Sequence, residues 1–110
     1  MHEFSLTQNI LKTALDHAET RKILRVNLSI GVFSHEREES IRFYWDELAK
    51  DTLAQEADLH FQRVAAEMKC LACSAVFHPE EETSLCPHCQ SHRLQLVSGD
   101  DVRLGSIDVE

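Results

Sequence analysis

Residues 68–92 read MKCLACSAVFHPEEETSLCPHCQSH, and this stretch decides how the chain folds. It holds all four cysteines and both prolines of the chain but few aliphatic residues. A segment this short buries too little apolar surface to hold itself together, so it needs a cross-link or a metal. We therefore predict a separate small module at 68–93 that folds around its cysteines.

The cysteine spacing is typical of a metal site. Cys70 and Cys73 form one C-x-x-C pair, Cys86 and Cys89 form a second, and residues 74–85 separate the pairs. A hairpin that brings two such pairs together completes a tetrahedral shell of four thiolates, which suits structural Zn(II). Iron held by the same sulfurs, as in rubredoxin, is the main alternative metal, and disulfides or unligated thiols are the alternative without one. Since four sulfurs leave no open position, we predict that zinc supplies folding free energy.

Three histidines, His78, His88 and His92, lie near these cysteines. We interpret them as surface residues or as neighbours of the ligands, and the sequence leaves open whether any of them ever replaces a cysteine at zinc. Residues 80–82 are a run of glutamates. Such a run is usually a solvated loop, and it also argues against a ribbon that binds phosphates.

The charge balance of the whole chain argues against a nucleic-acid partner. The 110 residues include 19 acidic and 11 basic side chains, for a formal net charge of −8, whereas binding to a phosphate backbone depends on clustered Lys and Arg. No apolar run approaches the length of a membrane span. Residues 1–22 carry charges throughout and lack the apolar core of a signal peptide. We therefore expect a cytoplasmic protein with no membrane partner, in a compartment that keeps thiols reduced.

The rest of the chain alternates helical and strand patterns. Residues 5–20 carry apolar side chains at helical spacing, and Ser5 with Gln8 resembles a capping box that would start the helix near Ser5. Residues 23–31 alternate as a half-buried strand, with Leu24, Val26, Leu28 and Ile30 on one side. Residues 37–52 are predicted to be an amphipathic helix with Ile41, Tyr44, Trp45 and Leu48 on its apolar face. Further strands are expected at 59–66, 93–97 and 101–110, the last with a bulge at Gly105.

The chain begins MHEFS, and its first three residues form a candidate chelate. The amine of Met1 and the Nδ1 atom of His2 flank the backbone nitrogen of His2, so the three atoms close two adjacent chelate rings on one ion. The backbone nitrogen or the carboxylate of Glu3 can add a further donor. Such a nitrogen-rich, square-planar or tetragonal shell favours Ni(II) or Cu(II) over zinc. The alternative is that a histidine at position 2 is an accident of sequence.

Taken together, these features resemble the HypA/HybF family of nickel chaperones for [NiFe]-hydrogenase maturation. MHEFS at the start, the first amphipathic helix, a strand that ends in SIG, the C-x2-C-x12-C-x2-C module and the closing GDDVRLGSIDVE carry the resemblance over essentially the full chain. The resemblance implies an α+β fold with two helices on a three-stranded antiparallel sheet and an inserted β-rich zinc ribbon. We accordingly expect a nickel-binding domain at 1–67 and 94–110 and a zinc-ribbon domain at 68–93.

The resemblance also implies the ligands and partners. Nickel would be bound by His2, assisted by the terminal amine of Met1 and the neighbouring backbone, with Glu3 also implicated; zinc would be bound by the four cysteines. Nickel would pass, as transient cargo, to the precursor of the hydrogenase large subunit with the GTPase HypB as partner. A homodimer, the hydrogenase isoenzyme served and a second role in urease maturation are left open. One departure from the family is the segment before the second helix, SHEREESIRF, in which His35, Glu36 and Glu38 are interpreted as a solvated helix start.

Two other classes of function compete with a chaperone. An enzyme is not expected, because the sequence has no Ser-His-Asp pattern, no glycine-rich phosphate loop and only three glycines. The alternative of another class is a zinc-ribbon adaptor or a transcription-associated binding module, which would share the cysteine spacing but would not need the MHE start.

Overall fold

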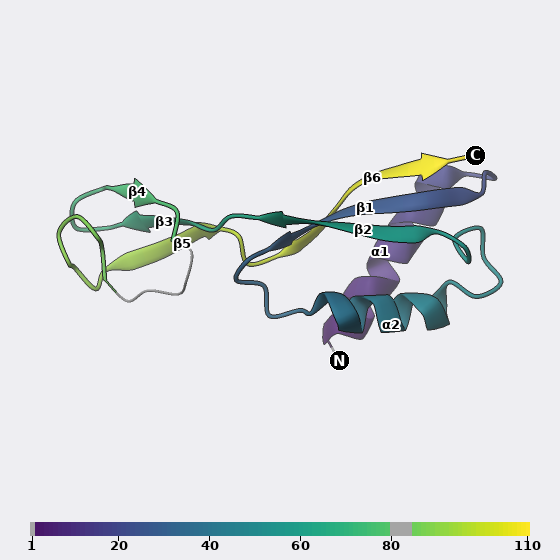
Figure 1. Ribbon diagram of the computed structural model, residues 1–110, viewed down its shortest axis with the longest axis horizontal. Helices are drawn as coiled ribbons and strands as arrows, with labels where there is room; N and C mark the ends of the chain where they lie inside the picture. Colours follow the sequence, from purple (N-terminus) through teal and green to yellow (C-terminus); the bar gives the residue numbers. More distant parts are fainter. Residues whose placement is uncertain (1, 80–84) are drawn as a thin grey trace. The chain divides into compact units, whose positions relative to one another are not determined.

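The structure is a computed structural model that describes residues 2–79 and 85–110. Figure 1 shows its helices and strands, which follow one another along the chain as α1 (His2–Ala18), β1 (Ile23–Gly31), α2 (Glu38–Leu48), β2 (Asp58–Val64), β3 (Glu67–Cys70), β4 (Val76–Phe77), β5 (Leu94–Ser98) and β6 (Val102–Val109). The chain divides into two compact units: residues 1–29, 36–62 and 102–110 form the first, and residues 30–35 and 63–101 form the second. The predicted domains, 1–67 with 94–110 and 68–93, are meant as parts that fold independently. They stay a prediction, which metal removal can test.

The first unit contains a three-stranded sheet in the order β2-β1-β6. Strands β1 and β2 run in the same direction, because Ile23 N–H donates to the Leu53 carbonyl at one end and Val32 N–H donates to the Val64 carbonyl at the other. Helix α2 makes the crossover that a parallel pair requires. Strand β6 runs against β1 (Figure 1). The predicted α+β class with two helices is confirmed, and the sheet is mixed rather than wholly antiparallel.

Both helices share one hydrophobic core with this sheet. The buried side chains come from one face of α1, one face of α2, β1, β2 and the loop between α2 and β2: Ile10, Leu11, Ala14, Ala18, Ile23, Val26, Leu28, Ile41, Trp45, Ala49, Ala54 and Leu59. Helical spacing explains the two helix faces. The predicted alternation of β1 is wrong at its start, because Ile23 is buried and Leu24 is 46% exposed. From Val26 onward the predicted side of the strand does face the core.

The start of α1 differs from the sequence prediction. The helix begins at His2 rather than near Ser5. Local capping signals favoured Ser5, but Phe4 packs edge-on against Tyr44 of α2, with ring centroids 5.4 Å apart, and this contact orders the first turn. Tertiary packing therefore extends the helix to the beginning of the described chain.

The second unit contains a small antiparallel sheet in the order β4-β3-β5. Met68 pairs with Phe77 of β4 and Cys70 pairs with Leu94 of β5. Gly99 follows β5 with φ of +103°, a backbone angle that favours glycine, and the chain bends at residues 99–100 before β6. Within the described residues, 2–79 and 85–110, neither helix is long and apolar enough to cross a membrane.

Candidate functional site

The four cysteines converge in the second unit. Cys70 ends β3, and its Sγ lies 3.6 Å from Cys89 Sγ, while Cys73 Sγ lies 3.7 Å from Cys86 Sγ. All four sulfurs lie within 4.8 Å of one another, and all four residues are free cysteines. A tetrahedral shell with Zn–S bonds of about 2.3 Å has S···S edges of about 3.8 Å. The spacing therefore fits four thiolates around one ion, and it does not fit two disulfides.

The two C-x-x-C segments have the same backbone hydrogen bonds. In each, the carbonyl of the first cysteine accepts from the N–H four residues later, and its own N–H donates to the carbonyl five residues later. The residue after each second cysteine, Ser74 or Gln90, has a positive φ, 64° and 61° respectively. In each segment a backbone N–H also points at the first sulfur, from Cys73 to Cys70 and from His88 to Cys86, both at 3.4 Å. These N–H groups stabilise thiolates, as expected of metal ligands.

The electrostatics of the cluster favour a cation. The backbone N–H of Cys73 is the main reason that the pKa of Cys70 falls to about 6. At Cys89, the backbone of Ser91 lowers the pKa, but the neighbouring Cys70, burial and the other two cysteines outweigh it and raise the pKa to about 12. One thiolate thus suppresses ionisation of the next, because like charges so close repel. A divalent cation at the centre removes this repulsion, so the donor set fits zinc.

The predicted nickel ligands lie at the start of α1 in the first unit. His2 is the first residue of the helix, and Glu3 is in its first turn. Met1, the third predicted ligand, lies outside the described residues. The first backbone N–H groups of a helix have no acceptor within it. The amide nitrogens of His2 and Glu3 can therefore serve a metal without breaking helical hydrogen bonds.

Three successive residues at this start contact α2 or the segment that leads into it. His2 Nε2 contacts Glu36 Oε1, the Arg37 N–H donates to Glu3 Oε2 at 2.8 Å, and Phe4 packs on Tyr44. Arg37 is the N-cap residue of α2 and makes no side-chain cap of its own. The Glu3 carboxylate thus binds a backbone N–H at the start of α2, a role that the sequence did not indicate.

Glu36 differs from its sequence-based prediction as part of a solvated helix start. Its side chain is 10% exposed, whereas the His2 side chain is 82% exposed. A nearly buried glutamate is uncommon without a partner. The prediction of a solvated helix start is therefore wrong for Glu36. Glu38 has another partner, since Arg42 Nη2 lies 3.1 Å from its Oε1. The sequence signal was the acidic segment 35–39, but nothing in it distinguished Glu36 from its neighbours.

The histidines near the cysteines are not members of the cysteine group of close ligand atoms, although the backbone N–H of His88 donates to Cys86 Sγ. Across the part of the chain that the structure describes, the cysteines are the one group of three or more close potential ligands. His78 Nε2 lies 3.9 Å from Glu67 Oε1, at the limit of an ion pair. The run at 80–82 lies outside the described residues.

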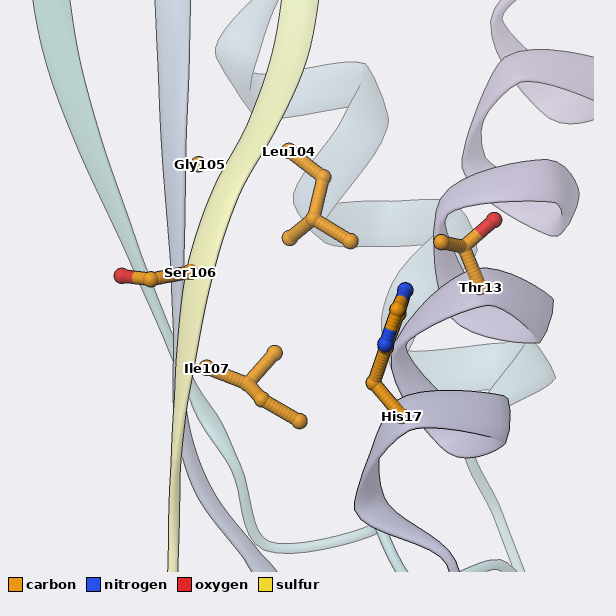
Figure 2. Close-up of a pocket in the computed structure, with 6 residues that line it drawn as sticks. All are labelled: Thr13, His17, Leu104, Gly105, Ser106 and Ile107. Carbon is orange, nitrogen blue, oxygen red and sulfur yellow. The ribbon is translucent and has the colours of Figure 1, made fainter.

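A surface pocket of 340 Å³ lies elsewhere in the first unit, between α1 and β6. Figure 2 shows Leu104 and Ile107 of β6 projecting toward Thr13 and His17 of α1. His17 is in the last turn of α1, at the opposite end of the helix from His2. The pocket is therefore separate from the candidate nickel ligands.

Comparisons with known proteins cover nearly the whole chain. The family described as "Hydrogenase/urease nickel incorporation, metallochaperone, hypA" matches residues 1–109. The chain is 36% identical over 113 aligned positions to hydrogenase maturation factor HypA of Dehalococcoides mccartyi, covering all of this chain and 95% of that protein. It is also 36% identical to hydrogenase maturation factor HybF of Salmonella typhimurium, with full coverage of both.

Two solved structures share the fold. The solution structure of the Ni metallochaperone HypA from Helicobacter pylori superposes with a TM-score of 0.75 at 25% identity, covering 97% of this chain and 96% of that one. A second solution structure, that of a HypA protein, gives a TM-score of 0.77 at 25% identity, covering all of this chain and 97% of that one.

Proposed function

Because this chain belongs to the HypA family of nickel metallochaperones, which act in hydrogenase maturation and are not enzymes, we propose that it binds Ni(II) at its amino terminus and delivers it to the [NiFe]-hydrogenase large-subunit precursor. The observation that carries this proposal is the position of His2. Its imidazole and the first two backbone nitrogens of α1 lie together at an exposed helix start.

The proposed nickel shell consists of nitrogen donors. The amine of Met1, the backbone nitrogen of His2 and the Nδ1 atom of His2 close two chelate rings and occupy three positions of a square plane, and the backbone nitrogen of Glu3 can add a further donor. Such a shell selects Ni(II) over zinc by geometry. We assign Glu3 a backbone donor because its carboxylate is hydrogen-bonded to Arg37 N–H. Protons compete for the amine and the imidazole, so nickel affinity falls as the pH falls.

Zinc has the separate, structural role. We propose that Cys70, Cys73, Cys86 and Cys89 hold one Zn(II) ion, which supplies no open position to a substrate. The spacing of their sulfurs and the N–H groups aimed at them support this assignment.

Delivery requires a site that a recipient can reach. The His2 side chain is 82% exposed, so incoming ligands can replace it without unfolding the domain. We propose that the partners are those implied by the family resemblance: the hydrogenase large-subunit precursor and the GTPase HypB. We also propose that delivery takes place in the cytoplasm.

The test is a nickel titration of untagged, zinc-loaded protein. Calorimetry measures nickel binding, and metal analysis measures the nickel and zinc content. One nickel site should be present in the native protein and absent in His2→Ala and in a variant with one residue added before Met1. His17→Ala is the matched control, since His17 lies on the same helix at its other end. Zinc content should be the same in all four proteins. Equal nickel binding by the extended protein would contradict the proposed ligand set.

A further inference from the structure

We propose that Glu36 is a positioning residue for nickel capture: its carboxylate accepts the Nε2 proton of His2 and thereby leaves Nδ1 free to bind the metal. This inference rests on the proposed function, because it concerns the same imidazole. It assigns a role to a residue that lies outside the proposed ligand set and 34 residues from His2.

The first support is the pairing of an exposed imidazole with a nearly buried carboxylate. Glu36 Oε1 contacts Nε2 of His2, not Nδ1. The Glu36 side chain is 10% exposed, so the protein around it restricts its position, whereas the His2 side chain at 82% exposure has little else to restrict it. The carboxylate is therefore the fixed partner, and the imidazole is the partner that becomes oriented.

The second support is that neighbouring residues also hold the start of α1 against the segment that contains Glu36. Next to the pair, Glu3 Oε2 accepts from the Arg37 N–H at 2.8 Å. One residue further along α1, the ring of Phe4 packs on Tyr44. These two contacts, made by residues that follow His2 and Glu36 in the chain, restrict sliding of residue 36 relative to residue 2. Glu36 thus reaches His2 from a backbone that is itself anchored.

The chemistry follows from the two nitrogens of a neutral imidazole. One nitrogen carries a proton and the other a lone pair. A carboxylate at Nε2 favours the tautomer with the proton on Nε2, and the lone pair is then on Nδ1. Only Nδ1 can close a six-membered ring with the backbone nitrogen of the same residue. Metal-bound histidines commonly donate their other N–H to a carboxylate, and losing that partner typically costs about 10–100-fold in metal affinity.

The test compares Glu36→Ala, Glu36→Gln and the control Glu39→Gln, a change of another carboxylate at the start of α2. Nickel affinity is measured by competition titration of the untagged, zinc-loaded protein. We expect a loss of about 10–100-fold in Glu36→Ala. Glu36→Gln should lose less, because its amide oxygen can still accept the Nε2 proton, and Glu39→Gln should not change. Fluorescence of Trp45, which is buried in the same unit, checks that each variant is folded.

A second measurement needs no nickel. Nitrogen-15 NMR of the imidazoles, at a pH where they are neutral, should find the His2 proton on Nε2 in the native protein and in Glu36→Gln, and a mixture of tautomers in Glu36→Ala. Native nickel affinity and an unchanged tautomer in Glu36→Ala would overturn the inference. Loss of an oxygen donor from the nickel spectrum of Glu36→Gln would also overturn it, because Glu36 would then be a ligand.

These results separate the inference from the proposed function. If His2→Ala abolishes nickel binding while Glu36→Ala does not weaken it, the positioning role is wrong and the amino-terminal site stands. If His2→Ala still binds nickel like the native protein, the proposed site is wrong, and with it the role of Glu36 in nickel capture.

Discussion

Removing zinc from the cysteine cluster should unfold the second unit while the first unit stays folded. The change is Cys73→Ser or treatment of the full chain with a strong zinc chelator. A serine hydroxyl is a poor zinc ligand at neutral pH, so the variant should lose the ion. The loss of folded structure should be confined to residues 63–101 and the short segment 30–35.

The magnitude follows from how little else this unit buries. Among its described residues, the buried aliphatic side chains are Ile30 and Ala66, and two of the other buried residues are the ligands Cys70 and Cys86. A small core rarely contributes more than about 3–5 kcal/mol. Structural zinc contributes about 10–16 kcal/mol in comparable small modules at neutral pH. The free energy of folding that is lost with the ion therefore exceeds what the remaining contacts in this unit can supply.

Trp45 makes the assay specific. It is the single tryptophan of the chain, is 2% exposed and belongs to the core of the first unit. After zinc removal its emission should stay blue-shifted, and the circular dichroism of α1 and α2 should persist. Backbone NMR signals of the second unit should collapse to unfolded positions, and added zinc should restore them after chelation. A red shift of Trp45 emission on zinc loss would refute the separation of the units.

Three further changes test other contacts. Gly31→Ala should destabilise the protein by about 3 kcal/mol or more, since its Cβ would lie 2.1 Å from a backbone carbonyl oxygen, while Gly105→Ala, 3.3 Å from its nearest neighbour, should cost far less in thermal unfolding. Ser74→Gly should raise the stability of the zinc-loaded unit by about 1 kcal/mol by relieving its positive φ, and a lower melting temperature would contradict this. Glu56→Gln breaks the contact with Lys22, which lowers the pKa of Glu56, so its effect on Tm should be present near neutral pH and vanish as the pH falls below the usual range of glutamate.

The core elements were predictable because their signals are local. The apolar faces of α1 and α2 follow helical spacing, and both Ile41 and Trp45 are buried as predicted. The convergence of the cysteines was also predictable, because two C-x-x-C pairs with a metal leave few other geometries. These features depend on residues close together in the sequence.

The features that sequence reasoning missed depend on contacts between distant residues. The Ser5 capping signal is local, but the packing of Phe4 on Tyr44 extends α1 to His2. The direction of β2 depends on whether the connection through α2 returns the chain to the end of the sheet where β1 begins, and no single segment encodes that. Glu36 could not be separated from the neighbouring glutamates, because its burial and its contact with His2 arise only when the two segments meet.

X-ray absorption at the nickel edge, on untagged protein loaded with one zinc and one nickel, tests the central claim most directly. The account predicts nitrogen and oxygen donors around nickel, one of them an imidazole, with no sulfur, and the loss of this spectrum in His2→Ala. Sulfur donors at nickel in the zinc-loaded protein, unchanged in His2→Ala, would contradict it.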